Sequence, residues 1–173
     1  MNANRKVSPM VKYDYVKTKR EDVTEIPADR VAVSRKVTRW YTHFNIWVYK
    51  ISRGRLMSNF PGGYPICVVG TKGAKSGQRR EIALIHLPYG DNMLLVASQG
   101  GMPMSPAWFH NVTANPEIDV LHRGNKRNMV ARRVSDDEKR ELWPHLLSLY
   151  PPFDEYQART DRNIPVFVCT PVE

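Results

Sequence analysis

Apolar residues recur at two different spacings along the chain, and the two spacings predict different kinds of element. Between residues 31 and 53 they return every three or four positions, which is the period of an α-helix. The recurring residues are Val33, Val37, Trp40, Phe44, Trp47 and Ile51, with Tyr41 and Val48 at the margin of the stripe. The opposite side carries Arg35, Lys36, Arg39, Lys50 and Arg53. This pattern predicts a basic amphipathic helix, whose stripe either packs on the core or faces a lipid surface.

Beyond residue 60, short apolar runs separated by turn residues are typical of strands. We expect strands at residues 66–69, 81–88, 93–97, 117–122, 129–134 and 164–169. Residues 81–88 and 93–97 flank the turn at 89–92 and predict one hairpin; a second is expected around Arg123-Gly124-Asn125. The run 81–88 is apolar on nearly both faces, which indicates a barrel wall covered on both sides.

Helices are few, and their starts carry capping signals. Ser105 is the expected N-cap of a helix that has Pro106 in its first turn and that ends before Pro116. Ser135 and Glu138 form a capping box, which predicts another helix start. The expected helices after the first are 106–114, 136–149 and 153–159. Antiparallel hairpins with few helices predict an α+β fold built on a small barrel.

The chain divides into an arm and one domain. Residues 1–30 mix charges and prolines with little periodic apolar content, so we expect a mobile or extended arm. Residues 31–173 are expected to form a single domain. Cys67 and Cys169 lie in apolar runs, which favours buried reduced thiols over a disulfide. No run approaches the roughly 20 apolar residues that span a bilayer, and the first residues lack a signal-peptide core, so we expect a cytoplasmic protein.

The net charge of +9 is concentrated near the N-terminus. Residues 1–60 contain thirteen Lys or Arg against five Asp or Glu, whereas residues 61–173 contain thirteen against twelve. A nucleic-acid-binding domain spreads basic charge over its folded surface, so we expect no nucleic-acid partner. The five His and two Cys lack the spacing of metal ligands, and no metal site is predicted.

The stretch 70–111 combines features of a site for a phosphorylated cofactor. Its first loop interleaves glycines with the cations Lys72, Lys75, Arg79 and Arg80. Exposed backbone N–H groups and positive charge together suit a phosphate. A second glycine-containing loop at 98–101 and a helix start follow closely. The loop is not a Walker A motif, because Ala74 stands where glycine is required, and no G-x-G-x-x-G opens a helix.

Several separated motifs resemble, in order, those of the deazaflavin (coenzyme F420)-dependent nitroreductase family of actinobacteria. They are GAKSGQRR at 73–80, VASQGG at 96–101, PAWFHN at 106–111, ANP at 114–116, Tyr156-Gln157 and Thr160-Asp161-Arg162. The resemblance runs from about Trp40 to the C-terminus. It implies a split β-barrel, similar to flavin reductases and pyridoxamine-phosphate oxidases, and reduced coenzyme F420 as the hydride donor.

The resemblance also implies which residues form the site. Lys75, Ser76 and Arg80 match positions that bind the phosphate and acidic tail of the cofactor. Three segments match the lining of the deazaflavin: Glu81, Ile82, Ala83, Leu84 and Ile85; Val96, Ala97, Ser98 and Gln99; and Ala107, Trp108, Phe109, His110 and Asn111. Phe153 and Tyr156 match the substrate pocket, with Tyr156 as a proton donor or substrate orienter.

Three positions depart from the family pattern, and two of them bear on the cofactor tail. Ala74 and Gln99 replace basic residues, and Phe153 replaces a tyrosine of the substrate pocket. The implied function is hydride transfer from reduced F420 to a quinone-like, enone or nitro acceptor, with quinones and enones favoured over nitroimidazoles. A non-catalytic deazaflavin carrier and an FMN-binding oxidoreductase of the same fold are the alternatives. For residues 31–53, contact with the inner face of the cell membrane is the alternative to core packing.

Overall fold

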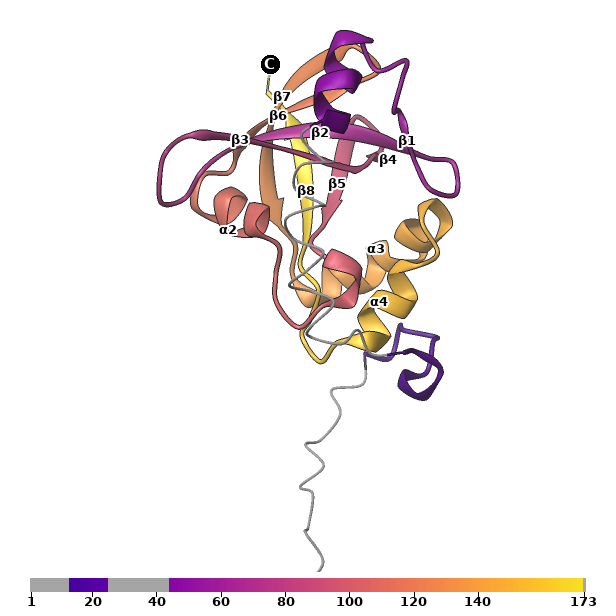
Figure 1. Ribbon diagram of the computed structural model, residues 1–173. Coiled ribbons are helices and arrows are strands. Elements are labelled where there is room, and N and C mark those ends of the chain that lie inside the picture. The colour runs from indigo at the N-terminus through magenta and orange to yellow at the C-terminus, as the bar shows by residue number, and fades with distance from the viewer. Residues whose placement is uncertain (1–12, 25–43, 173) are drawn as a thin grey trace, which may run out of the picture.

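The structure is a computed structural model that describes residues 13–24 and 44–172 (Figure 1). Its strands are β1 (Asn59–Phe60), β2 (Tyr64–Lys72), β3 (Arg79–Ile85), β4 (Leu87–Tyr89), β5 (Asn92–Val96), β6 (Glu117–His122), β7 (Asn125–Arg133) and β8 (Val166–Pro171). Its helical elements are η1 (Arg20–Asp22), residues 44–51, η2 (Gln99–Gly101), α2 (Ala107–Ala114), α3 (Asp136–Leu149) and α4 (Phe153–Arg159).

All strand pairs are antiparallel, and they form one eight-stranded sheet. The strand order is β1-β2-β6-β7-β8-β5-β4, and β3 also pairs with β2. The sheet curls strongly, with α3 and α4 on one side and α2 beside the tip of the β2–β3 hairpin (Figure 1). The expected α+β split-barrel fold is confirmed.

The apolar strand sequences follow from burial on both faces of the curled sheet. Alternate residues of β2, β5 and β8 point into the barrel: Cys67, Val69, Met93, Leu95, Phe167 and Cys169. The intervening residues of β5 and β8 pack on α3 and α4: Leu94, Val96, Val166 and Val168. Neither face meets water, so near-continuous apolar runs replace the alternation of a half-exposed strand. Cys67 and Cys169 are buried free thiols, and burial raises the pKa of each to about 12.

The hairpin predicted between residues 81–88 and 93–97 is wrong in its first arm. The apolar run divides at His86, and β3 pairs along its whole length with β2, from Ile66↔Ile85 to Lys72↔Arg79. Only the short β4 pairs with β5. An unbroken apolar run hides this change of partner, because both halves of the run need burial. The cationic loop at 73–78 therefore closes a long β2–β3 hairpin instead of preceding a separate one.

The boundaries of the helices agree closely with their capping signals. The Ser135 side chain accepts a hydrogen bond from the Glu138 N–H at 3.2 Å, as the capping box predicts. The helix α2 ends before Pro116, as expected, but its N-cap is Pro106 and not Ser105, and no side chain caps it. The hairpin around Gly124 is present between β6 and β7.

The orientation of the helix at 44–51 differs from the expectation that its predicted stripe packs on the core. Phe44, Trp47 and Ile51 are 44%, 59% and 64% exposed. Ile46 and Tyr49 are buried instead, against residues of β2. The Tyr49 hydroxyl fixes this face, since it donates to the Ile66 carbonyl at 3.2 Å. Residues 31–43, with the rest of the stripe, lie outside the described residues.

The N-terminal strap, which we define as residues 13–24, lies beside α4 and away from the helix at 44–51 (Figure 1). Its backbone N–H groups at Lys17 and Thr18 donate to the buried carboxylate of Asp154, at the start of α4. Its Tyr13 and Tyr15 rings lie about Lys139 of α3, at 5.4 Å each. The strap is thus joined to the two helices by specific polar contacts.

Candidate functional site

A hollow of about 440 Å³ lies between the β2–β3 hairpin loop and α2. Its walls come from three segments: Thr71, Gly73, Ala74, Lys75, Ser76, Arg80, Glu81, Ile82, Ala107, Trp108, His110 and Asn111. Nine of these belong to the residues that the sequence predicts for cofactor binding. The structure therefore brings the cationic loop, the start of β3 and the start of α2 to one place.

The helix α2 holds the hairpin loop in shape. Asn111 accepts from the Ala74 N–H at 3.0 Å through Oδ1 and donates to Thr71 Oγ1 at 3.2 Å through Nδ2. Asn115 Nδ2 donates to the Lys72 carbonyl at 3.3 Å. Within the loop, the Gly73 N–H donates to the Gln78 carbonyl at 2.8 Å. The asparagines thus tie the hairpin loop to the helix, and Asn111 serves as a scaffold of the hollow as well as part of its lining.

The charge of the hollow is positive at its rim. Lys75 and Arg80 are exposed, and among the described residues neither forms an ion pair with a carboxylate. Glu81 is the acidic residue of the wall, and Lys50 and Arg79 neutralise it at 3.0 and 3.1 Å. Burial opposes ionisation of Glu81, but the hydrogen bonds from these two cations prevail and lower its pKa. Lys75 and Arg80 are therefore available to bind an anion.

The inner wall is apolar and suits a planar ring system. Trp108 is buried, and its ring lies 6.1 Å from that of Phe167 on the barrel floor. Ile82 packs against the same core cluster. A rim of cations beside an apolar wall matches a ligand that has a charged tail and an aromatic ring. The residues present therefore fit a phosphorylated deazaflavin.

Other predicted lining residues do not face this hollow. They are Ala83, Leu84, Ile85, Val96, Ala97, Ser98, Gln99 and Phe109. Phe109 is half-buried under the Arg133 guanidinium, which lies 5.9 Å from its ring. The segment 96–99 forms the end of β5 and the start of η2. Phe153 is buried against Tyr150, and the Tyr156 hydroxyl lies 3.0 Å from the Tyr150 hydroxyl.

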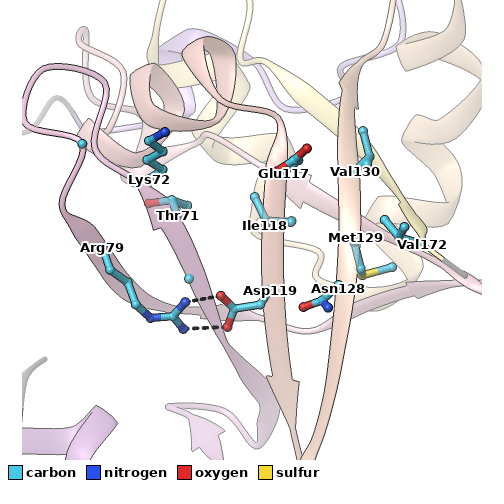
Figure 2. A pocket seen from close by; sticks show the side chains of 12 residues that line it. Thr71, Lys72, Arg79, Glu117, Ile118, Asp119, Asn128, Met129, Val130 and Val172 are labelled. Carbon is cyan, nitrogen blue, oxygen red and sulfur yellow. Dashed lines mark hydrogen bonds and ion pairs between the residues drawn. The ribbon is translucent and has the colours of Figure 1, made fainter.

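A second hollow, of about 500 Å³, lies against β2, β6 and β7 (Figure 2). Figure 2 shows the Arg79 guanidinium paired with both carboxylate oxygens of Asp119 across β2. The pair needs Gly70 beneath it, because a Cβ there would come within 2.5 Å of both side chains. Hydrogen bonds from Arg79 lower the pKa of Asp119. Glu117 and Asp119 offset the cations Lys72 and Arg79 that also line this hollow, so it suits an anion less well than the hollow at Lys75.

Sequence reasoning assigned no role to two arginines at the end of α4. Arg159 and Arg162 donate hydrogen bonds to backbone carbonyls between Ala97 and Met102, including that of Gly100 at 2.6 Å. The resemblance had included Arg162 only as part of a motif. Side chains that bind main-chain carbonyls leave no signal in composition or spacing, so only the structure reveals them.

The fold and the hollow indicate a class: a split-barrel protein whose hollow, between a cationic loop and a helix, fits a phosphorylated aromatic cofactor. Residues 40–171 match the model of the F420H(2)-dependent quinone reductase family. The chain belongs to this family. It is an enzyme whose cofactor is reduced coenzyme F420, which confirms the family, enzyme class and cofactor expected from the motifs.

Individual relatives agree with the family assignment. An F420H(2)-dependent quinone reductase of Mycobacterium tuberculosis is 36% identical over 126 residues, which are 71% of this chain and 85% of the relative. A second M. tuberculosis protein, described as a putative reductase of the same kind, is 31% identical over 68% of this chain and 98% of its own length. A solved F420-H2 dependent reductase is 39% identical, with a TM-score of 0.57 over 61% of this chain and 93% of that one.

Across residues 13–24 and 44–172, no three His, Cys, Asp or Glu residues are grouped so as to hold a metal ion. In the same part of the chain, no helix has the length and apolar character needed to cross a bilayer.

Proposed function

We propose that this enzyme passes a hydride from reduced F420, bound in the hollow beside Lys75, to a quinone-like acceptor. The observation that carries the proposal is the meeting of Lys75, Arg80 and Trp108 around one hollow in a chain of the F420H(2)-dependent quinone reductase family. The deazaflavin supplies two-electron hydride transfer, because carbon replaces the flavin N5 in its ring. The family description favours a quinone over an enone or a nitro compound as the acceptor.

The residues of the chain contribute binding and orientation. Backbone N–H groups of the loop, with Lys75, Ser76 and Arg80, hold the phosphate and acidic tail by charge-assisted hydrogen bonds. Ile82, Ala107 and Trp108 cover apolar ring surface and exclude water. A quinone needs one hydride and one proton to become a hydroquinone. Tyr156 or water provides the proton, and the Tyr156 hydroxyl already shares a hydrogen bond with Tyr150.

The tail site is tested by comparing neighbouring arginines of β3. Arg80 faces the proposed site, whereas Arg79 faces the second hollow. Replacing Lys75 or Arg80 by Ala should weaken F420 binding by about 1.5–3 kcal/mol, the usual contribution of a hydrogen bond to a charged group. The Arg79→Ala variant should lose less affinity than either, because Arg79 acts on the proposed site only through its ion pair with Glu81. Cofactor titration by fluorescence measures each dissociation constant, and added salt should weaken parental binding.

The outcomes of this titration separate the candidate functions. Loss of affinity in Arg79→Ala with none in Arg80→Ala would move the site to the hollow of Figure 2. Binding of FMN in preference to F420 would favour the FMN-binding oxidoreductase. Tight F420 binding without oxidation of the reduced cofactor by menadione or cyclohexenone would favour a non-catalytic carrier.

We further propose that the exposed stripe at Phe44, Trp47 and Ile51 contacts anionic lipid at the inner face of the membrane. The exposed cations Arg53 and Arg55 follow the stripe directly. Aromatic and aliphatic side chains beside basic ones are the composition of an interfacial helix. A lipid-soluble quinone would then reach the enzyme from the bilayer. Residues 31–43, which carry the rest of the predicted stripe, lie outside the described residues.

Vesicle binding tests the lipid contact with point variants. Truncation to residue 53 is unsuitable, because it removes the buried Tyr49 and the N-terminal strap. Trp47→Ser should reduce co-sedimentation with phosphatidylglycerol vesicles roughly 10-fold, given about 1.5–3 kcal/mol for burying a large apolar side chain. Val130→Ser, at another exposed apolar position, is the matched control. If parent and Trp47→Ser sediment equally, the stripe does not meet lipid.

A further inference from the structure

One arginine holds the first part of the connection from β5 to α2, and we call this part the β5–α2 loop (residues 97–102). Arg162 Nη2 donates to the carbonyls of Ala97 at 3.0 Å and Ser98 at 2.8 Å. Its Nε donates to the carbonyl of Met102 at 2.8 Å. A single planar guanidinium thus spans both ends of the loop. A lysine ammonium is a point charge on a flexible stem and cannot reproduce this fork.

The same loop is pressed against α4. Arg159 Nη1 donates to the Gly100 carbonyl at 2.6 Å, and its Nε donates to Thr24 of the strap at 3.1 Å. A Cβ at Gly101 would lie 2.6 Å from the Tyr156 carbonyl and 3.0 Å from Arg159 Cβ. The backbone of the loop therefore touches the backbone of the helix that carries Tyr156.

The loop contains one residue, Gln99, whose backbone conformation the surrounding structure must support. Gln99, Gly100 and Gly101 all have positive φ, at 47°, 66° and 80°. Left-handed backbone at a non-glycine residue is unfavourable and persists where the surroundings enforce it. Among the described residues Arg162 has no carboxylate partner, so its half-buried charge is used on main-chain carbonyls. A half-buried cation without a counter-charge is costly, which indicates a role beyond surface solvation.

We propose that Arg162 is a positioning residue for hydride transfer. It fixes the β5–α2 loop, which leads into the wall of the cofactor hollow at Ala107 and Trp108 of α2, against the helix that carries the predicted substrate-side Tyr156. Arg162 then sets the distance between the cofactor side and the acceptor side of the site. The inference rests on the proposed function, because those two assignments belong to it. Misplacement by about 1 Å can reduce a rate roughly 100-fold, so loss of the fork should act on kcat.

The test uses the full chain with Arg162→Lys, and Arg132→Lys as the matched control. Arg132 also donates two hydrogen bonds, but to Glu138 at the surface, at 2.9 and 2.7 Å. F420 fluorescence titration gives the bound stoichiometry, and menadione kinetics give kcat per bound cofactor and KM. We expect Arg162→Lys to lower kcat per bound cofactor about 10-fold or more. The menadione KM should change less than about twofold, and Arg132→Lys should match the parent.

A second variant distinguishes a positioning role of Arg162 from a purely structural one. Arg162→Ala should regain part of its kcat when millimolar methylguanidinium is added, because the free cation can occupy the vacated position. A structural role would lower only the melting temperature and the bound fraction, with kcat per bound cofactor unchanged in both variants; that result overturns the inference. A parent that fails to bind F420 overturns the proposed function itself. An active parent with an equally active Arg162→Lys overturns the inference alone.

Discussion

The Asp154→Ala variant should lose about 3–5 kcal/mol of the free energy of unfolding, because buried donors left without an acceptor cost about 1–3 kcal/mol each. Asp154 is 7% exposed. Its carboxylate accepts from the Thr18 N–H and Thr18 Oγ1, both at 2.6 Å, from the Lys17 N–H at 3.0 Å and from Trp143 Nε1 at 3.1 Å. Burial opposes ionisation, but these hydrogen bonds prevail and lower the pKa of Asp154.

Urea unfolding of Asp154→Ala and of Asp14→Ala, side by side, isolates the buried contact. Asp14 also joins the strap to α3, through Arg140 at 3.1 Å, but this pair is exposed. Exposed pairs contribute about 0–1 kcal/mol, so Asp14→Ala should unfold almost as the parent does. Proteolysis within residues 13–24 should accelerate in Asp154→Ala only. If the two variants have the same free energy of unfolding, the contact of Asp154 with the strap does not stabilise the fold.

The fold was predictable where a local pattern determined the structure. The capping box at Ser135 and the turn at Gly124 act over a few residues, so their signals survive in sequence. The division of the run 81–88 at His86 leaves no such local signal, because the strand with which each half pairs depends on residues distant in sequence. The buried face of the helix at 44–51 also escaped prediction. Its stretch Ile46-Trp47-Val48-Tyr49 is apolar all round, and polar contacts such as the hydrogen bond of Tyr49 to β2 select a face.

The parts of the candidate site that a few neighbouring residues define could be predicted from the sequence. Glycines interleaved with Lys75 and Arg80 signal an anion loop by themselves. The opposite orientations of Arg79 and Arg80 follow from strand alternation, once β3 is known to begin at Arg79. The contacts of Asp154 and Arg162 are different in kind. They join residues separated by 136 and 64 positions, between a side chain and main-chain atoms, and such pairs have no sequence pattern.

Lys139 is the other buried charge that the sequence did not reveal, and its titration gives a second large effect. The side chain is 2% exposed and donates to Gln157 Oε1 at 2.8 Å and to Asn163 Oδ1. Its ammonium lies 5.0 Å from the ring centre of Trp143 and 5.4 Å from the centre of each tyrosine ring of the strap. Burial lowers the pKa of Lys139 to about 7, with Asp136 opposing the shift and Arg162 and Arg133 adding to it.

The sign of the pH effect follows from the ordinary lysine pKa of 10.5 in the unfolded chain. Between pH 7 and about 10.5 the unfolded state binds the proton and the folded state does not. The free energy of unfolding should therefore rise with pH across this window, and the contribution of Lys139 should be constant below it. At about 1.4 kcal/mol per unit, the whole shift corresponds to roughly 4–5 kcal/mol.

Urea unfolding at pH 7, 8, 9 and 10 gives the free energy of unfolding of the parent and of Lys139→Met. The change of their difference with pH is the contribution of Lys139. Other titrating groups cancel in the difference, because methionine keeps the length of the side chain without a proton to lose. We expect the parent to gain about 1 kcal/mol or more per pH unit on this variant. The difference between Lys139→Arg and Lys139→Met should stay flat, since arginine remains charged throughout. A flat difference for the parent as well would show that the three rings and two amide oxygens stabilise the ammonium enough to offset its burial.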